Sequence, residues 1–528
     1  MIFAQDPKRL LVPRWRSVSD TIRAGELDAL PGKPALGAVE LAEQGKREFS
    51  QKQARWAETL KVEDAEELVA AAIVSGVTTN EVCRAAAAIL KDPAAQSGSR
   101  RLAQGILEPL PQDAPRPALV TRAEIQQLKR LVVKSPHDAL RVAELSRLYT
   151  LLGQRKPAIV AMRRALALAD TNRYVLRSAV RLLIHVGRED EAAALIADHG
   201  LTERDPWLMA AAVGAAQAAG HGGRLMRAAS RMVMSDNHSA FSLSELRASL
   251  ATEHLNAGEI KLARRQFRLS LKAPTENALA QAKWAQGVDK AIEISSDLMG
   301  RPEAHEAHAL DTARIGHWER SLVATGEWKA DERFSGKPFV HASWISTGPL
   351  NSPADALPWL QEGLVANPDD PSLLNNLAVA KAMLGDLDRA DDALTRARKN
   401  AEDDAFPLIL AATEGLIAFR RGDPISGAAL YQQALSTCVE KRLPHQWLRV
   451  AAYLARELAA IDFRYAKATL DQIEIVETEM RKRGHTISQE ISAVTNSVRD
   501  STEKEVTDNE WNWDLSILSK LRDSLLLN

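Results

Sequence analysis

The sequence predicts an all-α protein made of repeated helical hairpins. Alanine, leucine, arginine and glutamate dominate the composition, whereas the alternating valine, threonine and tyrosine typical of strands are almost absent. Five stretches of the chain also align with one another without gaps, each with a glycine at the same place. A pattern that recurs in this way indicates a solenoid, in which each hairpin buries its apolar side against the next.

Each aligned stretch contains the same three kinds of residue at the same spacing. The stretches are 145–165, 179–199, 250–270, 377–397 and 414–434. The shared glycines are Gly153, Gly187, Gly258, Gly385 and Gly422. Five residues later come Ala158, Ala192, Ala263, Ala390 and Gly427, and a further four residues on come Met162, Ile196, Phe267, Leu394 and Tyr431. Glycine accepts the left-handed conformation that ends a first helix, the small residue lets the second helix approach closely, and the larger residue fills the gap to the neighbour.

This pattern resembles the tetratricopeptide repeat, whose motif combines leucine, tyrosine, glycine, alanine, an aromatic residue and proline. The matching residues are Leu145, Tyr149, Gly153, Ala158, Met162 and Ala165 in one repeat, and Leu377, Ala378, Gly385, Ala390, Leu394 and Ala397 in another. The resemblance covers roughly residues 120–480. It implies a right-handed α-solenoid, a TPR-like superhelix, with a helical N-terminal region and a C-terminal capping helix.

We expect seven segments along the chain. They are an irregular N-terminal arm (1–34), a helical domain that includes degenerate repeats or a cap (35–107), a proline-rich linker (108–118), TPR-like repeats (119–283), an irregular His/Trp-rich segment or degenerate repeats (284–350), further TPR-like repeats (351–480) and C-terminal helices (481–528). Helical spacing at the C-terminal end relates Trp511, Leu515 and Leu518, and also Ile517, Leu521 and Leu525. We expect this helix to cap the last repeat, with a partner-docking helix as the alternative.

Bulk composition limits the classes of function. The formal net charge is −1, so no global field attracts nucleic acid or anionic lipid. Cys83 and Cys438 are too few for a disulfide framework, which favours a reducing cytosol. No secretory signal is visible, and the most apolar segments, 68–77 and 207–220, are too short to cross a bilayer. We therefore expect a cytoplasmic protein that does not enter a membrane.

The motifs of common enzymes are missing from the sequence. His305 and His308 lie one helical turn apart, but they lack the spacing of an HExxH zinc helix, and no third ligand is evident. Neither a GxxxxGK[ST] phosphate loop nor a GxSxG nucleophile turn occurs. We expect a non-catalytic protein with no cofactor and no metal. A metal-dependent enzyme centred on 305–341 is the disfavoured alternative.

Three arginines are candidates for partner binding. Arg147 and Arg181 occupy equivalent places in two successive repeats, and Arg177 lies one turn before Arg181. A hairpin solenoid presents this face of its first helices inward, so the three side chains would line a concave groove suited to an acidic peptide. A solvated surface is the alternative. A nucleic-acid ligand is disfavoured, because neither an aromatic stripe nor a DNA-binding motif accompanies the arginines.

Asn375 and Asn376 are the second candidate. Asn376 directly precedes Leu377, and Asn375 lies beside it on the same side. In tetratricopeptide proteins an asparagine at this place often points into the groove and binds the backbone of an extended peptide, because an amide donates and accepts hydrogen bonds at once. The resemblance thus implies a peptide contact here, with a solvent-facing asparagine as the alternative.

These observations favour a non-catalytic scaffold or adaptor that binds a protein or peptide partner in its groove. The alternative is a regulatory or recognition subunit of a multi-protein bacterial system, for example in antiphage defence or toxin control.

Overall fold

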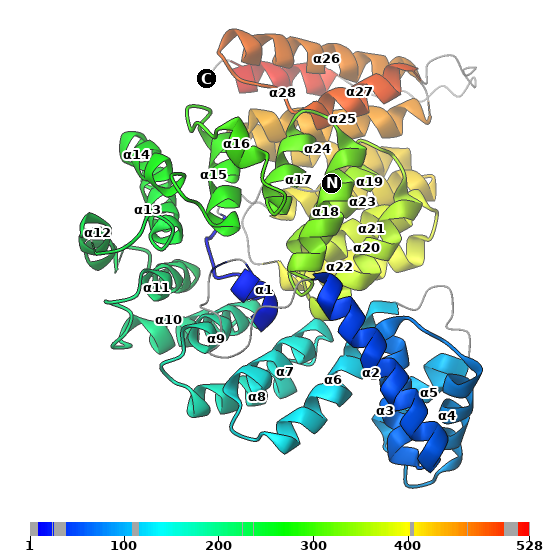
Figure 1. The fold of residues 1–528 in the computed structure, drawn as a ribbon. Coiled ribbons are helices and arrows are strands. Elements are labelled where there is room, and N and C mark those ends of the chain that lie inside the picture. Colours follow the sequence, from blue (N-terminus) through cyan, green and yellow to red (C-terminus); the bar gives the residue numbers. More distant parts are fainter. Residues whose placement is uncertain are drawn as a thin grey trace. The chain divides into compact units, whose positions relative to one another are not determined.

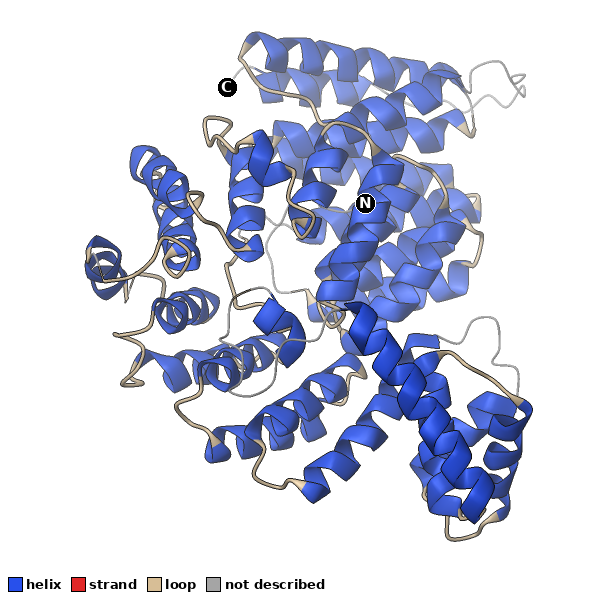
Figure 2. Ribbon diagram, in the orientation of Figure 1, coloured by secondary structure: helices blue, strands red, loops and turns tan. Residues whose placement is uncertain are grey.

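A computed structural model describes residues 9–23, 25, 38–107, 116–223, 225–235, 237–401, 406–461, 463–500 and 516–526. Every regular element within those ranges is a helix, as Figures 1 and 2 show. The predicted all-α fold is therefore confirmed. The chain divides into two compact units, which are described separately. The first unit comprises Pro7–Ala304 with Asp331–Phe334, and the second comprises His305–Ala330 with Ser335–Asn528.

The first unit begins with a group of helices around an alanine-rich core. The helices around this core are α2 (Ala38–Thr59), α3 (Val62–Ser75), α4 (Asn80–Lys91), α5 (Ser97–Leu107) and α6 (Arg116–Lys134), and α1 (Val18–Arg23) precedes them in the chain. Leu68 on α3 and Ile89 on α4 are completely buried in the core that α2–α6 share. Residues 108–115 of the expected linker lie outside the described residues, and α6 begins at Arg116.

Helical hairpins form the rest of the first unit. They are built from α7 (Ala139–Leu151), α8 (Arg155–Leu168), α9 (Arg173–His185), α10 (Glu189–Ala197), α11 (Pro206–Ala218), α12 (Met226–Met234), α13 (Ser244–Asn256), α14 (Ile260–Ser270), α15 (Glu276–Val288) and α16 (Ser296–Met299). The first helices of successive hairpins, α7, α9, α11, α13 and α15, also pack on one another in that order. We call these five helices the first-helix layer.

The repeat geometry matches the sequence pattern in both units. All five shared glycines have positive φ angles, between 66° at Gly153 and 87° at Gly422. The alanines five residues later are completely buried, and at Gly427 an added Cβ would lie 2.7 Å from the ring of Phe419. The larger residues are buried as well. The solenoid of close-packed hairpins predicted from these positions is confirmed.

The second unit continues the hairpin pattern. Its helices are α17 (His305–Arg314), α18 (Trp318–Asp331), α19 (Lys337–Thr347), α20 (Pro353–Ala366), α21 (Pro371–Met383), α22 (Leu387–Asn400), α23 (Phe406–Arg421), α24 (Pro424–Glu440), α25 (Pro444–Ala459), α26 (Phe463–Lys482), α27 (Gln489–Asp500) and α28 (Ser516–Leu526).

The interval 284–350, left open between irregular structure and degenerate repeats, contains a hairpin of α17 and α18. Gly316 between them has a φ of 81°, and buried Ser321 follows it by five residues. The Ser321 hydroxyl donates to the carbonyl of Ala309 at 2.8 Å. A serine thus takes the place of the small alanine in this hairpin.

Helix α28 packs against the C-terminal part of the second unit. Leu518 on α28 is buried, and Leu525 packs against the same core, which includes α24 and α26; the assignment of this helix as a cap stays a prediction. Trp511, Leu515 and the side chains of Ile517 and Leu521 lie outside the described residues.

Deeper in this part, the buried Glu490 carboxylate on α27 accepts hydrogen bonds from Trp344 Nε1 (2.9 Å), Tyr453 OH (2.9 Å) and Arg449 Nε (2.8 Å). These bonds link α27 to α19 and α25.

Candidate peptide-binding face

The three arginines proposed for partner binding lie on the first-helix layer, where each has contacts within the chain. On α9, Arg177 is buried and donates to Glu245 on α13 at 2.7 Å. Its guanidinium also lies 4.9 Å from the ring centre of Trp207. Arg181 is buried with its guanidinium 4.7 Å from the ring centre of Phe334, and this burial lowers its pKa.

Arg147 on α7 is partly buried and donates to Glu144 at 2.5 Å. Burial acts to lower the pKa of Arg147, but Glu144, Tyr174 and Glu124 together outweigh it and hold the pKa above its ordinary value. Arg147, Arg177 and Arg181 as partner contacts stay a prediction.

Asn375 and Asn376 lie between helices of the second unit. Both side chains on α21 are completely buried. Asn376 Nδ2 donates to Ser343 Oγ on α19 at 2.9 Å, and Thr413 Oγ1 on α23 donates to Asn375 Oδ1 at 2.8 Å. The two amides therefore connect three successive first helices of this unit. A partner could reach them only by separating these helices, and their role as partner contacts stays a prediction.

An extended segment of the chain covers part of the first-helix layer in the first unit. Residues 9–17, here called the arm segment, have no regular secondary structure and lead into α1, drawn in dark blue in Figure 1. Leu11 and Trp15 are each 1% exposed. Leu11 belongs to the core that includes α13 and α15, and Trp15 packs edge-on against Phe334 with ring centres 5.6 Å apart. Within the expected N-terminal arm, residues 9–17 thus pack on the first-helix layer without forming a helix or a strand.

Side chains of the layer bind the backbone of the arm segment. On α15, Gln281 Nε2 donates to the carbonyl of Arg9 at 3.1 Å, while Gln281 Oε1 accepts from Arg9 Nε at 2.7 Å. One turn earlier, Asn277 Nδ2 donates to the carbonyl of Val12 at 3.0 Å. At the other end, the Tyr174 hydroxyl on α9 donates to the carbonyl of Arg16 at 2.9 Å. Burial raises the pKa of Tyr174, which keeps this donor protonated.

The arm segment also approaches the backbone of α11 closely. A Cβ added to Gly214 would lie 2.3 Å from the carbonyl oxygen of Leu11 and 3.3 Å from its carbonyl carbon. Only glycine leaves room for a second backbone at this point. The layer therefore has both the space and the donors for an extended chain.

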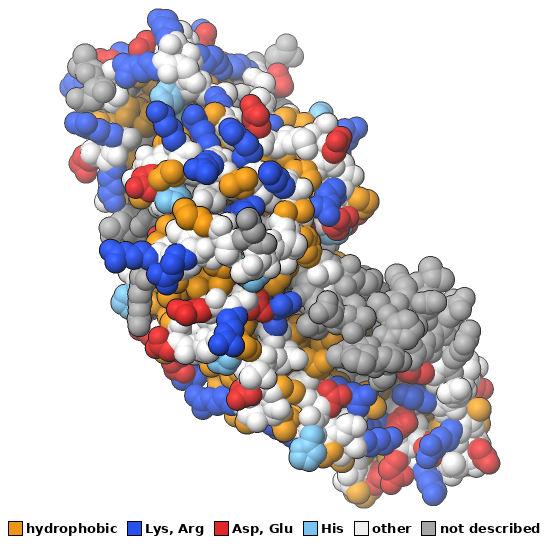
Figure 3. All heavy atoms as spheres, turned by 60° about the vertical axis from the view of Figure 1, so that its left-hand side comes forward, with side chains coloured by type: hydrophobic (Ala, Val, Ile, Leu, Met, Phe, Trp, Pro, Cys, Tyr) orange, Lys and Arg blue, Asp and Glu red, His pale blue; other side chains and the backbone are white. Residues whose placement is uncertain are grey.

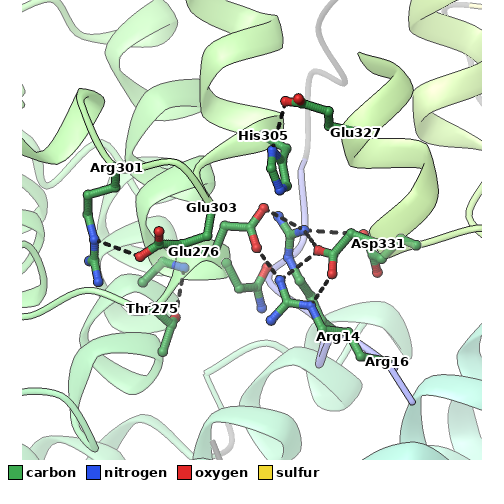
Figure 4. Close-up of polar contacts among 12 residues, drawn as sticks. Arg14, Arg16, Thr275, Glu276, Arg301, Glu303, His305, Glu327 and Asp331 are labelled. Atoms are coloured by element: carbon green, nitrogen blue, oxygen red, sulfur yellow. Dashed lines mark hydrogen bonds and ion pairs between the residues drawn. The ribbon is translucent and has the colours of Figure 1, made fainter. Parts of the chain in front are cut away.

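Carboxylates surround the arginines of the arm segment, as Figure 4 shows. Arg14 lies 3.3 Å from Glu276 on α15 and 3.1 Å from Asp331, and Arg16 contacts both carboxylates as well. Burial acts to lower the pKa of Arg16, but Asp331 and Glu276 outweigh this effect and raise it. Charged groups this far from water need such partners, because desolvation is otherwise unfavourable.

A buried network orients Asn277 toward the arm segment. Glu245 on α13 is 1% exposed and accepts hydrogen bonds from Asn277 Nδ2 (3.4 Å), Thr275 Oγ1 (3.3 Å) and Arg177. Arg177, proposed from the sequence as a ligand contact, thus neutralises the carboxylate beside Asn277. We call Tyr174, Gly214, Glu276, Asn277 and Gln281 the arm-binding face.

The described residues show no arrangement typical of a metal centre. No group of three or more His, Cys, Asp or Glu side chains that could hold a metal ion occurs among them. His305 Nδ1 lies 3.1 Å from Glu327 Oε2. His341 is buried with its Nε2 3.0 Å from the Ser321 hydroxyl, and burial lowers the pKa of His341 to about 4.

Two further observations concern membranes and surface charge. No helix in the described part of the chain is both long and apolar enough to cross a bilayer. Figure 3 shows one face of the molecule, on which Lys and Arg side chains are interspersed with Asp, Glu and apolar ones. This face therefore presents charges of both signs.

No model of a known protein family matches the sequence, and no curated protein does. Similar solved structures include the APC/C hetero-tetramer Cut9–Hcn1, with TM-score 0.37 and 14% identity over 88% of this chain and 97% of that chain. The human IFIT1 dimer with PPP-AAAA gives a TM-score of 0.37 and 12% identity over 72% and 95% of the two chains. Yeast Tom70 gives 0.30 and 11% over 72% and 92%. Because these TM-scores are low, the fold assignment depends on the geometry of the hairpins themselves. Each of the five aligned repeats has a left-handed glycine after its first helix and a buried small residue in its second, so the hairpins are tetratricopeptide-like.

Sequence reasoning missed the arm-binding face. The repeat alignment depends on a glycine after each first helix, whereas α15 ends at Val288 and is followed by Asp289. Without that glycine, the sequence does not relate Asn277 and Gln281 to Asn376. The available signal was a pair of amides four residues apart on an alanine-rich helix, which places both on one face.

Proposed function

We propose that this protein is a non-catalytic scaffold that binds an extended segment of a partner protein on the arm-binding face. One observation carries the proposal. Asn277 and Gln281 donate to main-chain carbonyls of an extended segment, three residues apart, that lies across the first-helix layer. Main-chain recognition of this kind supplies affinity for an extended peptide of varied sequence, while pockets for alternate side chains supply specificity.

The structure of the arm segment supports this function in a second way. Its residues 9–17 make contacts that a separate chain could make equally well, namely three backbone carbonyls, one apolar side chain and one aromatic ring. A scaffold and a regulatory subunit of a larger system both need a face that binds an extended segment of another protein. Both hypotheses therefore predict that a partner binds the arm-binding face.

Affinity capture of partners from host extract tests the proposal. We expect the full chain to retain a partner that the Asn277→Ala/Gln281→Ala variant loses, and cross-links from that partner should map to α15. Gln286→Ala is the matched control, since this amide on the same helix donates to the carbonyl of Ile292 instead of the arm segment. A partner held equally by the double variant would overturn the proposed face.

A further inference from the structure

We propose that the arm-binding face selects a basic extended segment of its partner, and that the arm segment competes for the same site within the chain. This inference rests on the proposed function and specifies the chemistry of its ligand. It differs from the acidic peptide that Arg147, Arg177 and Arg181 suggested from the sequence.

Charge is the first argument for a basic ligand. Arg177 is already paired with Glu245, the carboxylate that Asn277 also contacts, and its guanidinium lies over the ring of Trp207. By contrast, Glu276 and Asp331 direct their carboxylates at Arg14 and Arg16 of the arm segment. Glu332 adds a third carboxylate 3.9 Å from Arg14. An acidic segment in this position would place like charges in contact away from water, which is strongly unfavourable.

The spacing of side chains is the second argument. In an extended chain, residues two apart point to the same side. Arg14 and Arg16 accordingly both reach Glu276, while Trp15 between them packs on Phe334. Leu11, three residues before Arg14, fills an apolar position among helices α13 and α15. We therefore expect the arm-binding face to prefer a segment in which a leucine is followed three residues later by the triplet arginine–aromatic–arginine.

The arm segment is attached to the same chain as the face, which gives it an advantage over a separate partner segment. A tethered segment has an effective concentration of about millimolar order, so a partner segment of similar intrinsic affinity binds more weakly while the arm is in place. Weakening the arm without touching the face should then raise the affinity for a separate peptide. Weakening the face should lower it. Opposite changes in peptide affinity for the two kinds of variant distinguish an arm segment that competes with a partner from one with a structural role alone.

The test uses the full chain and a fluorescent peptide of residues 9–18, RLLVPRWRSV. We expect the Arg14→Ala/Arg16→Ala variant to bind this peptide at least ten-fold more tightly than the wild type, by fluorescence anisotropy. Adding Gln281→Ala removes the two hydrogen bonds that Gln281 makes to the arm sequence and should cost about ten-fold of that affinity. A peptide with its arginines replaced by glutamate should not bind. Circular dichroism confirms folding, and Trp15→Ala replaces the double variant if that variant does not fold.

Equal affinity of the wild type and the arm variant for the basic peptide would contradict the proposed competition by the arm segment. It would leave the proposed binding face unaffected. Tighter binding of the glutamate peptide would overturn the basic ligand class, again leaving the face intact. If a folded arm variant binds neither peptide, this inference is wrong. The capture experiment with the α15 variant then decides the proposed function separately.

Discussion

Replacing Gly214 with alanine introduces a methyl group into the space that the backbone of the arm segment occupies. The new Cβ would lie 2.3 Å from the Leu11 carbonyl oxygen, so either α11 or the arm segment must move by about 1 Å to restore a van der Waals contact. In an ordinary helix interior the same change stabilises by about 1 kcal/mol. Overpacking in a filled site costs about 1–3 kcal/mol. The two terms together predict a change of opposite sign, a net destabilisation of up to about 2 kcal/mol.

Two measurements check this prediction for Gly214→Ala. Denaturant unfolding gives the change in the free energy of unfolding, and hydrogen exchange followed by mass spectrometry reports the protection of residues 9–17. We expect lower stability together with faster exchange in the arm segment. Gly200→Ala is the control, because that glycine is exposed and an added Cβ meets nothing within 4 Å. Unchanged or higher stability with full protection of the arm segment would refute the reasoning.

Three further predictions concern the second unit. His341 has its pKa lowered to about 4 by burial, below the ordinary 6.5, so between these values the unfolded chain binds a proton that the folded chain excludes. The free energy of unfolding should thus fall by about 3 kcal/mol as the pH drops from 6.5 to 4, and this part should vanish in His341→Gln; parallel urea-stability curves for the two proteins would contradict it. Glu490→Ala should cost about 3–5 kcal/mol in denaturant unfolding, since it leaves the partly buried Arg449 without its carboxylate and the buried Trp344 Nε1 and Tyr453 hydroxyl without their acceptor, and a loss below about 1 kcal/mol would show that the network is unimportant. Asn376→Ala removes the hydrogen bond to Ser343 and should cost about 1 kcal/mol without altering partner capture, whereas lost capture at unchanged stability would instead support the peptide contact predicted from the sequence.

The sequence by itself determined the hairpins. Gly385, Ala390 and Leu394 act within ten residues of one another, and the structure places a left-handed turn, a helix contact and a core side chain at these positions. Such short-range rules can be recognised wherever the spacing recurs. Where serine takes the place of alanine, as at Ser321, the same geometry forms, but the spacing of glycine and alanine does not predict it.

Tertiary structure alone decided what lies on the first-helix layer. Arg14 meets Glu276 across 262 residues of sequence, and no periodicity relates the two. Arg177 and Asn376 show the same limit, because the sequence placed them on first helices but did not show that Glu245 and Ser343 already engage them. The physical reason is that helix periodicity reports which face of a helix is polar. It does not report whether solvent, a partner or a distant part of the same chain satisfies the polar groups on that face.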